Sequence, residues 1–231
     1  MKKFLVIVMC ALLVAMVPSC SSMNNTGKGA LVGAGGGAAL GAAIGAIAGK
    51  GKGAAIGAAI GGAVGAGTGT LIGKRMDKKA AELEAALKNA QVETVTDVNG
   101  LEAIKVTFDS GILFPTNGTS LSESSKVQLK EFANKMADMT DTDITIYGHT
   151  DNTGTAEVNE RISNQRAASV QNYLKSLGIA SSRMKAEGKS FNEPIADNST
   201  VEGRAQNRRV EIYVSANENM IKKAESEANA S

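Results

Sequence analysis

A short stretch of the chain combines acidic and basic side chains at a spacing that suits the binding of a charged ligand. Asp151 lies between two glycines, Gly148 and Gly154, where the missing side chain lets a ligand approach the backbone closely. Fifteen residues further on, Arg166 interrupts an otherwise apolar helical row, and a cation among apolar side chains requires a partner. The pattern is equally typical of a structural Asp151–Arg166 salt bridge and of a site that binds an ammonium and a carboxylate. The row consists of Val158, Ile162, Arg166 and Val170.

The same stretch holds the single histidine, His149, which beside Asp151 and Ser163 raises the question of hydrolytic chemistry. A Gly-x-Ser-x-Gly turn or a second carboxylate pairing would support a nucleophilic serine, and the sequence has neither. Metal binding has no better support, because the two cysteines are Cys10 and Cys20 and no His-x-x-x-His pair occurs. We therefore predict a protein that is not an enzyme and that uses no metal and no cofactor.

Alternating strand and helix patterns surround these residues and must position them. Apolar and polar residues alternate at 104–108, 144–146, 184–186 and 210–214, as in half-buried strands. Helical spacing of apolar residues occurs at 129–139 and 158–177, and the second helix ends at Gly178, a residue suited to a left-handed cap. Ser120–Glu123 and Ser199–Glu202 have the spacing of capping boxes. The order βαβαβ(α)β predicts an α+β domain at 99–216, with helices on one mixed sheet.

The composition argues against nucleic acid as a partner. Aromatic residues make up 3% of the 231 residues, too few for a platform on which bases stack. Two of the 25 basic residues lie in a predicted leader, which leaves 23 against 23 acidic residues. A formally neutral mature chain has no net attraction for phosphates.

The N-terminus has the architecture of an export signal. Lys2 and Lys3 precede an apolar run from Phe4 to Val17 that is too short to span a bilayer. The following VPSC resembles the lipobox of bacterial lipoproteins, which implies cleavage after residue 19 and acylation of Cys20. The alternative is an ordinary signal peptide with an incidental cysteine. The predicted signal peptide is 1–19, and the predicted lipidated linker is 20–28.

Glycine recurs at every fourth residue from Gly29 to Gly73 and forms two uncharged arms, 29–49 and 53–73, that GKGKG separates. Each arm of 21 residues would make about 31 Å of helix, close to the roughly 30 Å of a hydrocarbon core. Small residues at this spacing allow helices to pack closely in lipid, so we predict a glycine-zipper helical hairpin at 29–73 and a candidate homo-oligomer contact. The alternative is a flexible Gly/Ala linker. Neither arm holds Asp, Glu or His, which argues against an ion-driven stator.

Residues 74–98 are predicted to form a helical stalk. Met76, Ala80, Leu83, Leu87 and Ala90 follow a 4-3-4-3 spacing along one helical face. Two heptads are too few to establish a coiled coil, so a surface helix that packs on the next domain fits equally well. At the other end, residues 217–231 are predicted to be a polar, frayed tail.

Three motifs stand out in the predicted domain: FDSGILF at 108–114, IYGHTDNTGTAEVNERISNQRAASVQNYLKSLGI at 146–179 and GRAQNRRVEI at 203–212. Together they resemble the OmpA-like peptidoglycan-binding domain. In that family the Asp and the Arg fifteen positions later grip the free amino-acid end of diaminopimelate in a peptidoglycan stem peptide. The resemblance implies that Asp151 takes the ammonium and Arg166 the carboxylate. Asn159, Thr150 and Arg208 are further expected contacts. Of Arg208 and Arg209, one is expected to face the site or the helix packed on the sheet, and the other to face solvent.

The chain as a whole is similar to YiaD-like outer-membrane lipoproteins. Ser21 and Ser22 follow Cys20 with no acidic residue nearby, which in lipoproteins implies the outer membrane and a globular domain in the periplasm. The predicted function is non-covalent anchoring of the envelope to peptidoglycan, with outer-membrane lipid as a second partner through acylated Cys20. Two alternatives of other classes stay open: an envelope enzyme that remodels the cell wall, and an oligomeric membrane element whose active part is the glycine zipper.

Overall fold

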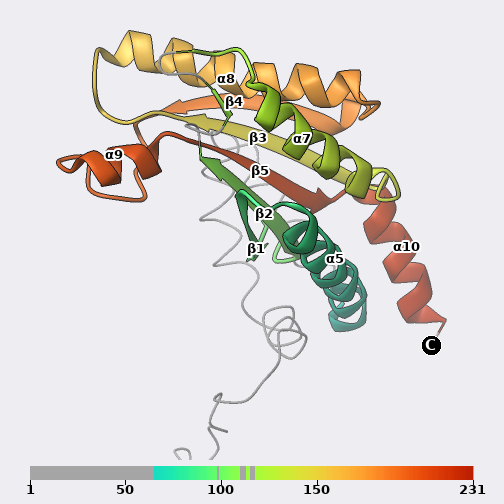
Figure 1. The fold of residues 1–231 in the computed structure, drawn as a ribbon. Helices are drawn as coiled ribbons and strands as arrows, with labels where there is room; N and C mark the ends of the chain where they lie inside the picture. Colours follow the sequence, from blue (N-terminus) through green and yellow to red (C-terminus); the bar gives the residue numbers. More distant parts are fainter. Residues whose placement is uncertain (1–64, 98, 110–112, 115–117, 231) are drawn as a thin grey trace, which may run out of the picture.

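Five strands form one mixed sheet in the computed structural model, which describes residues 65–97, 99–109, 113–114 and 118–230. The order across the sheet is β1-β2-β5-β3-β4 (Figure 1). Neighbouring strands run antiparallel except for β3 and β4, which run parallel. The strands are β1 (Ala90–Thr96), β2 (Glu102–Asp109), β3 (Thr142–His149), β4 (Met184–Ser190) and β5 (Arg209–Ala216). The predicted signal peptide, Cys20, the linker and residues 29–64 of the hairpin lie outside the described residues.

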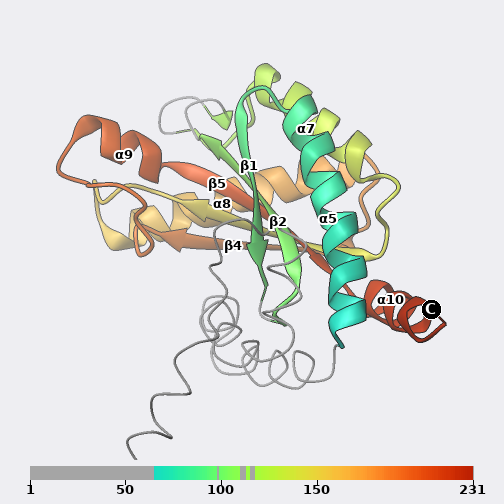
Figure 2. The same cartoon turned by 90° about the horizontal axis from the view of Figure 1, so that it is seen from below.

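Three helices cover one face of the sheet: α5 (Ala66–Ala86), α7 (Glu123–Met136) and α8 (Ala156–Ser176) (Figures 1 and 2). Val106, Ile212 and Ile146 lie side by side in the register of neighbouring strands and are fully buried under these helices. Burial of such side chains supplies the main driving force for folding. The α+β architecture predicted from the sequence is confirmed, with one more strand than the sequence indicated. The helices contribute Ile72, Met76, Leu83, Leu129, Phe132, Met136, Ala167, Val170 and Leu174 to the same core.

The predicted helical stalk is wrong in its second half. α5 ends at Ala86, and residues 90–96 form β1, which pairs with β2 so that Val92 lies opposite Val106. The β-branched residues at 92 and 94–96 favour a strand once a neighbouring edge is present. The apolar face predicted for the stalk is buried in the domain core, which bears out the alternative of a helix packed on the domain.

The boundary drawn at residue 73 between the hairpin and the stalk also differs from the structure. α5 begins at Ala66, inside the glycine row, and continues without a break through Gly73. Ile72 is fully buried in the domain core, so this end of the row packs on the globular domain. Within the residues described here, no helix has both the length and the apolarity to cross a bilayer.

The C-terminal segment forms a helix, α10 (Glu218–Asn229), where a frayed tail was predicted. Asn217 caps its N-terminus by accepting hydrogen bonds from the backbone N–H groups of Asn219 (2.9 Å) and Met220 (3.2 Å). α10 packs against α5, and Glu227 pairs with Arg75 at 2.7 Å. A short apolar stripe explains the docking: Met220, Ile221 and Ala224 are buried within an otherwise polar segment.

The helix ends are close to the predicted positions. Ser122 accepts the capping hydrogen bond of α7, two residues after the predicted Ser120. Thr200 accepts that of α9 (Val201–Asn207), one residue after the predicted Ser199. α8 ends as predicted, because Gly178 adopts a left-handed φ of 96° and the N–H of Ile179 donates to the carbonyl of Leu174 at 3.2 Å. A short 3₁₀ turn, η1 (Ser181–Arg183), then leads into β4.

Candidate functional site

The predicted site residues meet at the end of the sheet where β3 stops and α8 passes over it. Glycines at the end of β3 and β4 allow this approach: a Cβ on Gly148 would lie 2.2 Å from the carbonyl oxygen of Ser163, and a Cβ on Gly188 would lie 2.4 Å from its hydroxyl. Any larger residue would push α8 away from the sheet. The hydroxyl of Ser163 also accepts a hydrogen bond from the N–H of Ser190 at 3.1 Å. α8 is therefore held directly against the strand ends that carry the site.

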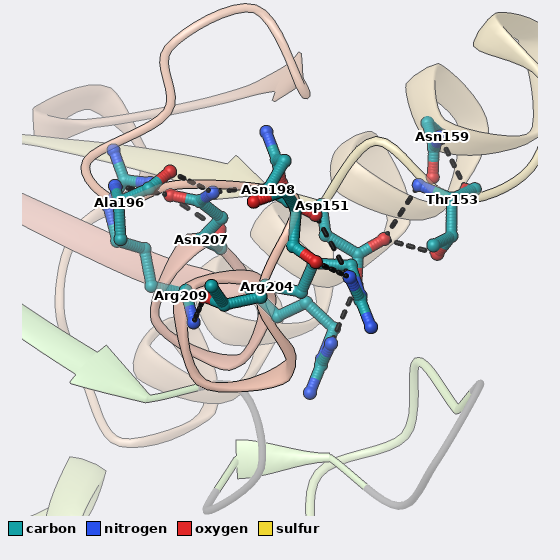
Figure 3. Close-up of polar contacts among 12 residues, drawn as sticks. Asp151, Thr153, Asn159, Ala196, Asn198, Arg204, Asn207 and Arg209 are labelled. Atoms are coloured by element: carbon teal, nitrogen blue, oxygen red, sulfur yellow. Dashed lines mark hydrogen bonds and ion pairs between the residues drawn. The ribbon is translucent and has the colours of Figure 1, made fainter.

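Asp151 is buried in the loop between β3 and α8, and both of its oxygens have partners. Oδ1 accepts hydrogen bonds from the N–H of Thr153 at 2.9 Å and from its hydroxyl (Figure 3). Oδ2 accepts from Nη1 of Arg208 at 2.6 Å. Burial alone would raise the pKa of Asp151, but the hydrogen bonds from Thr153 and Arg208 outweigh it and lower the pKa below its usual value. Asp151 is thus held as a carboxylate.

Arg166 lies on the buried side of α8, and one of its three guanidinium nitrogens has a hydrogen-bond partner among the described residues. Its Nε donates to the carbonyl of Gly118 at 3.2 Å, and its guanidinium lies 5.2 Å from the ring centre of Phe114. Burial and the nearby charge of Arg208 lower the pKa of Arg166, while the charge of Asp151 acts in the opposite sense. Among the described residues, none accepts a hydrogen bond from its two terminal nitrogens. These nitrogens are suited to a carboxylate from outside the chain.

The alternative of a structural Asp151–Arg166 salt bridge is not the arrangement found, because within the described part of the chain Asp151 forms its ion pair with Arg208. The predicted row on α8 holds for Arg166 and Val170, which are buried, but not for its first residue, because Val158 is exposed. The buried face of α8 is polar where the helix covers the site and apolar further along. This change obscures the helical period of apolar residues in the sequence. The buried face consists of Asn159, Ser163, Arg166, Ala167, Val170 and Leu174.

Asn159 and Thr150 both lie at the site, and Asn159 has a clear structural contact. The side-chain amide of Asn159 donates to the carbonyl of Thr153 at 2.9 Å and so stabilises the loop that carries Asp151 (Figure 3). Thr150 joins the loop to β4 through its backbone N–H, which donates to the carbonyl of Ser190 at 2.9 Å. The hydroxyl of Thr150 is buried and has no hydrogen-bond partner among the residues described.

One of the two arginines, Arg208, faces the site as expected, but the expectation that the other faces solvent is wrong, because Arg209 is buried and paired. Arg208 reaches Asp151 across the end of the sheet. Arg209 is buried on the opposite face of β5, where its Nε donates to Glu211 at 2.7 Å and its Nη2 donates to the carbonyl of Glu193 at 3.1 Å. Consecutive strand residues point to opposite faces, so the two arginines serve different clusters.

Residues 113–208 match the OmpA family, and this segment contains Asp151, Arg166 and Arg208. This chain carries an OmpA family domain. Residues 1–77 match the family described as YMGG-like Gly-zipper, and that match ends inside α5. The OmpA match begins after β2 and ends just before β5, so β1, β2, β5, α5 and α10 lie outside it.

Curated proteins are similar to this chain over about half of its length. Probable lipoprotein YiaD of Escherichia coli (strain K12) is 43% identical over 112 residues, which cover 48% of this chain and 48% of YiaD. Peptidoglycan-binding protein ArfA of Mycobacterium tuberculosis (strain ATCC 25618 / H37Rv) is 41% identical over 112 residues, covering 48% of this chain and 34% of ArfA. The chain therefore spans about a third to a half of the length of these relatives.

A solved structure resembles the fold over a longer segment. The cell wall anchor of the T6SS from Pseudomonas aeruginosa superimposes with a TM-score of 0.52 at 30% identity, covering 62% of this chain and 97% of that chain.

Sequence reasoning missed one residue of the OmpA domain that holds the site together, Asn207. Its fully buried side chain accepts from the N–H groups of Ile195 (2.8 Å) and Ala196 (3.0 Å) and donates to the carbonyl of Ala196 and to Asn198 (Figure 3). These bonds fix the loop before α9 and hence the backbone from which Arg208 projects. The only signal in the sequence was an amide next to the two arginines of NRR.

The other face of the OmpA domain's sheet carries a buried polar cluster beside the site loop. Glu211 accepts from Arg209 and, at 3.0 Å, from the hydroxyl of Tyr213, and its Oε2 lies 3.5 Å from Nε2 of His149. Burial by itself would raise the pKa of Glu211, but His149 and Arg209 lower it to about 2. Among the described residues no three His, Cys, Asp or Glu side chains are grouped so that they could hold a metal ion.

Proposed function

We propose that this chain binds peptidoglycan non-covalently by gripping the free amino-acid end of a diaminopimelate residue in the stem peptide. The observation that carries the proposal is that the charged Asp151 lies at the same end of the sheet as Arg166, whose two terminal nitrogens bond to none of the described residues. One end of the sheet thus offers a carboxylate that can accept hydrogen bonds from an ammonium and a guanidinium that can donate two parallel hydrogen bonds to a carboxylate. The OmpA family match and the name of ArfA, a peptidoglycan-binding protein, support the same ligand.

The division of labour follows from charge and geometry. Asp151 binds the ammonium through Oδ2, because Thr153 of its own loop holds Oδ1, whereas Oδ2 has the partly exposed side chain of Arg208 as its partner. Arg166 binds the carboxylate with its two terminal nitrogens, held in place by Gly118 and the ring of Phe114. Asn159 positions the loop of Asp151, and Thr150 is a further ligand contact through its buried hydroxyl, which bonds to none of the described residues. Each charge-assisted bond contributes about 1.5–3 kcal/mol, which gives a modest affinity for a single stem peptide.

We further propose that acyl chains on Cys20 anchor the protein in the outer membrane, with the OmpA domain in the periplasm. The lipoprotein name of YiaD and the YMGG-like Gly-zipper match at 1–77 support this arrangement. Attachment to a membrane beside the wall raises the effective concentration of stem peptides to about the millimolar range, so a weak grip suffices for anchoring. The glycine row would provide the contact for homo-oligomers.

Co-sedimentation with purified sacculi tests the ligand assignment. The full chain in detergent is mixed with sacculi and pelleted, alongside Asp151→Ala and Arg166→Ala. We expect the unmodified chain to pellet and both variants to stay in the supernatant. Glu160→Gln and Arg161→Ala change an exposed carboxylate and an exposed guanidinium on α8 and should pellet normally. Equal pelleting of all five proteins would refute the site.

The same mixtures separate anchoring from wall remodelling, because an enzyme would release soluble sugar or peptide fragments into the supernatant. We expect none. Acylation is tested in cells with Cys20→Ser: loss of the lipid-modified form, seen as accumulation of the uncleaved precursor, is the expected result. Unchanged processing would contradict lipidation at Cys20.

A further inference from the structure

The two oxygens of Asp151 are occupied in different ways. Oδ1 is held by Thr153, two residues away in the same loop, and this contact belongs to the loop itself. Oδ2, the oxygen that a ligand's ammonium needs, is held by Arg208 from the other side of the sheet end at 2.6 Å. The side chain of Asp151 is 7% exposed and that of Arg208 is 41% exposed. The partner of Oδ2 is therefore the accessible, outer member of the pair.

The two arginines of the site are held to different degrees. Arg166 is buried, donates through Nε to Gly118 and stacks against Phe114. Arg208 sits at the C-cap of α9 with its backbone N–H bonded to the carbonyl of Arg204 at 3.1 Å, and the one hydrogen bond that its side chain makes among the described residues is the part-buried bond to Asp151. A long, partly exposed side chain that a single ion pair holds changes rotamer and partner readily. Arg166 is fixed and Arg208 is movable.

The charges of the site require Arg208 to leave Asp151 when a cationic group of a ligand binds there. The site holds two guanidinium groups and one carboxylate, and the charge of Arg208 is close enough to lower the pKa of Arg166. A ligand ammonium that reached Oδ2 with Arg208 in place would put a third positive charge beside a single negative one. A ligand that also carries a carboxylate removes the conflict, because it supplies a second anion for the displaced guanidinium.

We propose that Arg208 is a specificity-determining residue that occupies Asp151 in the free protein and moves onto the carboxylate of the incoming ligand, beside Arg166. This inference rests on the proposed function and extends it. A ligand with an ammonium alone must displace Arg208 without giving it a new partner, and so binds weakly. A ligand with both groups on one carbon exchanges one ion pair for two. Arg208 thereby makes the site selective for a zwitterionic amino-acid end over a plain amine.

Two soluble stem tripeptides that differ by one carboxylate provide the test. L-Ala-γ-D-Glu-meso-diaminopimelate ends its side chain in a zwitterion, and L-Ala-γ-D-Glu-L-Lys ends it in an amine. Binding of each to the full chain in detergent is measured by isothermal titration calorimetry. We expect the first to bind at least about tenfold more tightly, the equivalent of one charge-assisted bond.

Arg208→Gln removes the competing charge. The lysine tripeptide should then bind more tightly than it binds the unmodified chain, the diaminopimelate tripeptide should bind more weakly, and their ratio should fall to about threefold or less. Arg208→Lys keeps a cation next to Asp151 and should retain most of the discrimination. Arg161→Gln, which removes an exposed guanidinium elsewhere on α8, should leave the ratio unchanged. Thermal denaturation of each variant establishes that it is folded.

The outcomes separate this inference from the proposed function. If the unmodified chain binds the diaminopimelate tripeptide and Arg208→Gln leaves the ratio intact, the exchange is refuted while the site stands. If folded Arg208→Gln loses both tripeptides in equal measure, Arg208 is an ordinary ligand contact and the exchange is again refuted. If the unmodified chain binds neither tripeptide, the proposed function fails and the exchange fails with it.

Discussion

Asp151 and Arg208 are 57 residues apart in the chain, yet Oδ2 of one lies 2.6 Å from Nη1 of the other. The antiparallel register of β3 and β5 brings them together, because Gly148 near the end of β3 lies opposite Val210 near the start of β5. The loop that leaves β3 and the turn that enters β5 therefore meet at the same end of the sheet. This geometry adds a second guanidinium to a site where the sequence indicated one main cation.

Arg166→Lys tests whether the site needs a guanidinium rather than a positive charge alone. Lysine keeps the charge but cannot donate two parallel hydrogen bonds or stack as a planar group on Phe114. We expect binding to sacculi to weaken about ten- to a hundredfold, the equivalent of one strong hydrogen bond. Arg161→Lys on the exposed side of α8 is the matched control. Undiminished binding by Arg166→Lys would show that Arg166 makes no bidentate contact.

Gly148→Ala tests the close packing of α8 on the sheet. The new Cβ would lie 2.2 Å from the backbone oxygen of Ser163, so α8 or β3 must shift, and we expect a loss of about 1–3 kcal/mol in the free energy of unfolding. Weaker binding should accompany it because Asp151 and Arg166 move apart. Gly69→Ala in α5 meets no atom within 4 Å and should raise stability by about 0.5–1 kcal/mol. Urea titrations of both variants measure these changes, and equal midpoints would contradict the packing argument.

Asn207→Ala tests whether this residue positions Arg208. The substitution leaves the N–H groups of Ile195 and Ala196 without their acceptor, and each lost hydrogen bond costs about 0.5–1.5 kcal/mol. Hydrogen exchange at these two amides should accelerate, and binding to sacculi should weaken. Gln206→Ala, an exposed neighbour on α9, should change neither property. Unaltered protection of the two amides in Asn207→Ala would show that Asn207 does not hold the loop before α9.

Asp97→Asn tests a pH dependence of stability in the turn between β1 and β2. Burial raises the pKa of Asp97 to about 6, against the hydrogen bonds from the N–H groups of Leu101 and Asn99 that lower it. The folded state therefore binds a proton more tightly than the unfolded state, so stability falls as the pH rises from about 4 to 6. A shift of about two pKa units corresponds to about 2–3 kcal/mol at pH 7.

Asparagine remains uncharged at every pH. Its side-chain amide could donate to the buried side-chain oxygen of Asn99, Oδ1, which has no partner in the described part of the chain. The variant should match the unmodified chain near pH 4 and exceed its stability at pH 7. Thermal denaturation at both pH values measures the difference. Identical pH profiles for the two proteins would show that Asp97 titrates normally.

Several elements could be predicted from local pattern alone. β2, β3, β4 and β5 alternate apolar and polar residues because one face of the sheet is buried, and α8 ends at Gly178 because only glycine adopts a left-handed φ without strain. Segments whose conformation depends on a distant neighbour were missed. β1 needs the edge of β2, and α10 needs the apolar surface of α5, so neither shows a strong signal of its own.

The sequence by itself determined which residues form the candidate site, because the motifs around Asp151, Arg166 and Arg208 are local and specific. It also determined the order of strands and helices from β2 to β5, since hydrophobic period is a property of neighbouring residues. Only the tertiary structure decided which charges pair. Ion pairs depend on distances of a few ångströms, and strand register and helix packing set these distances between residues far apart in the chain. That is why Asp151 binds Arg208, Arg209 binds Glu211, and the terminal nitrogens of Arg166 bond to none of the described residues.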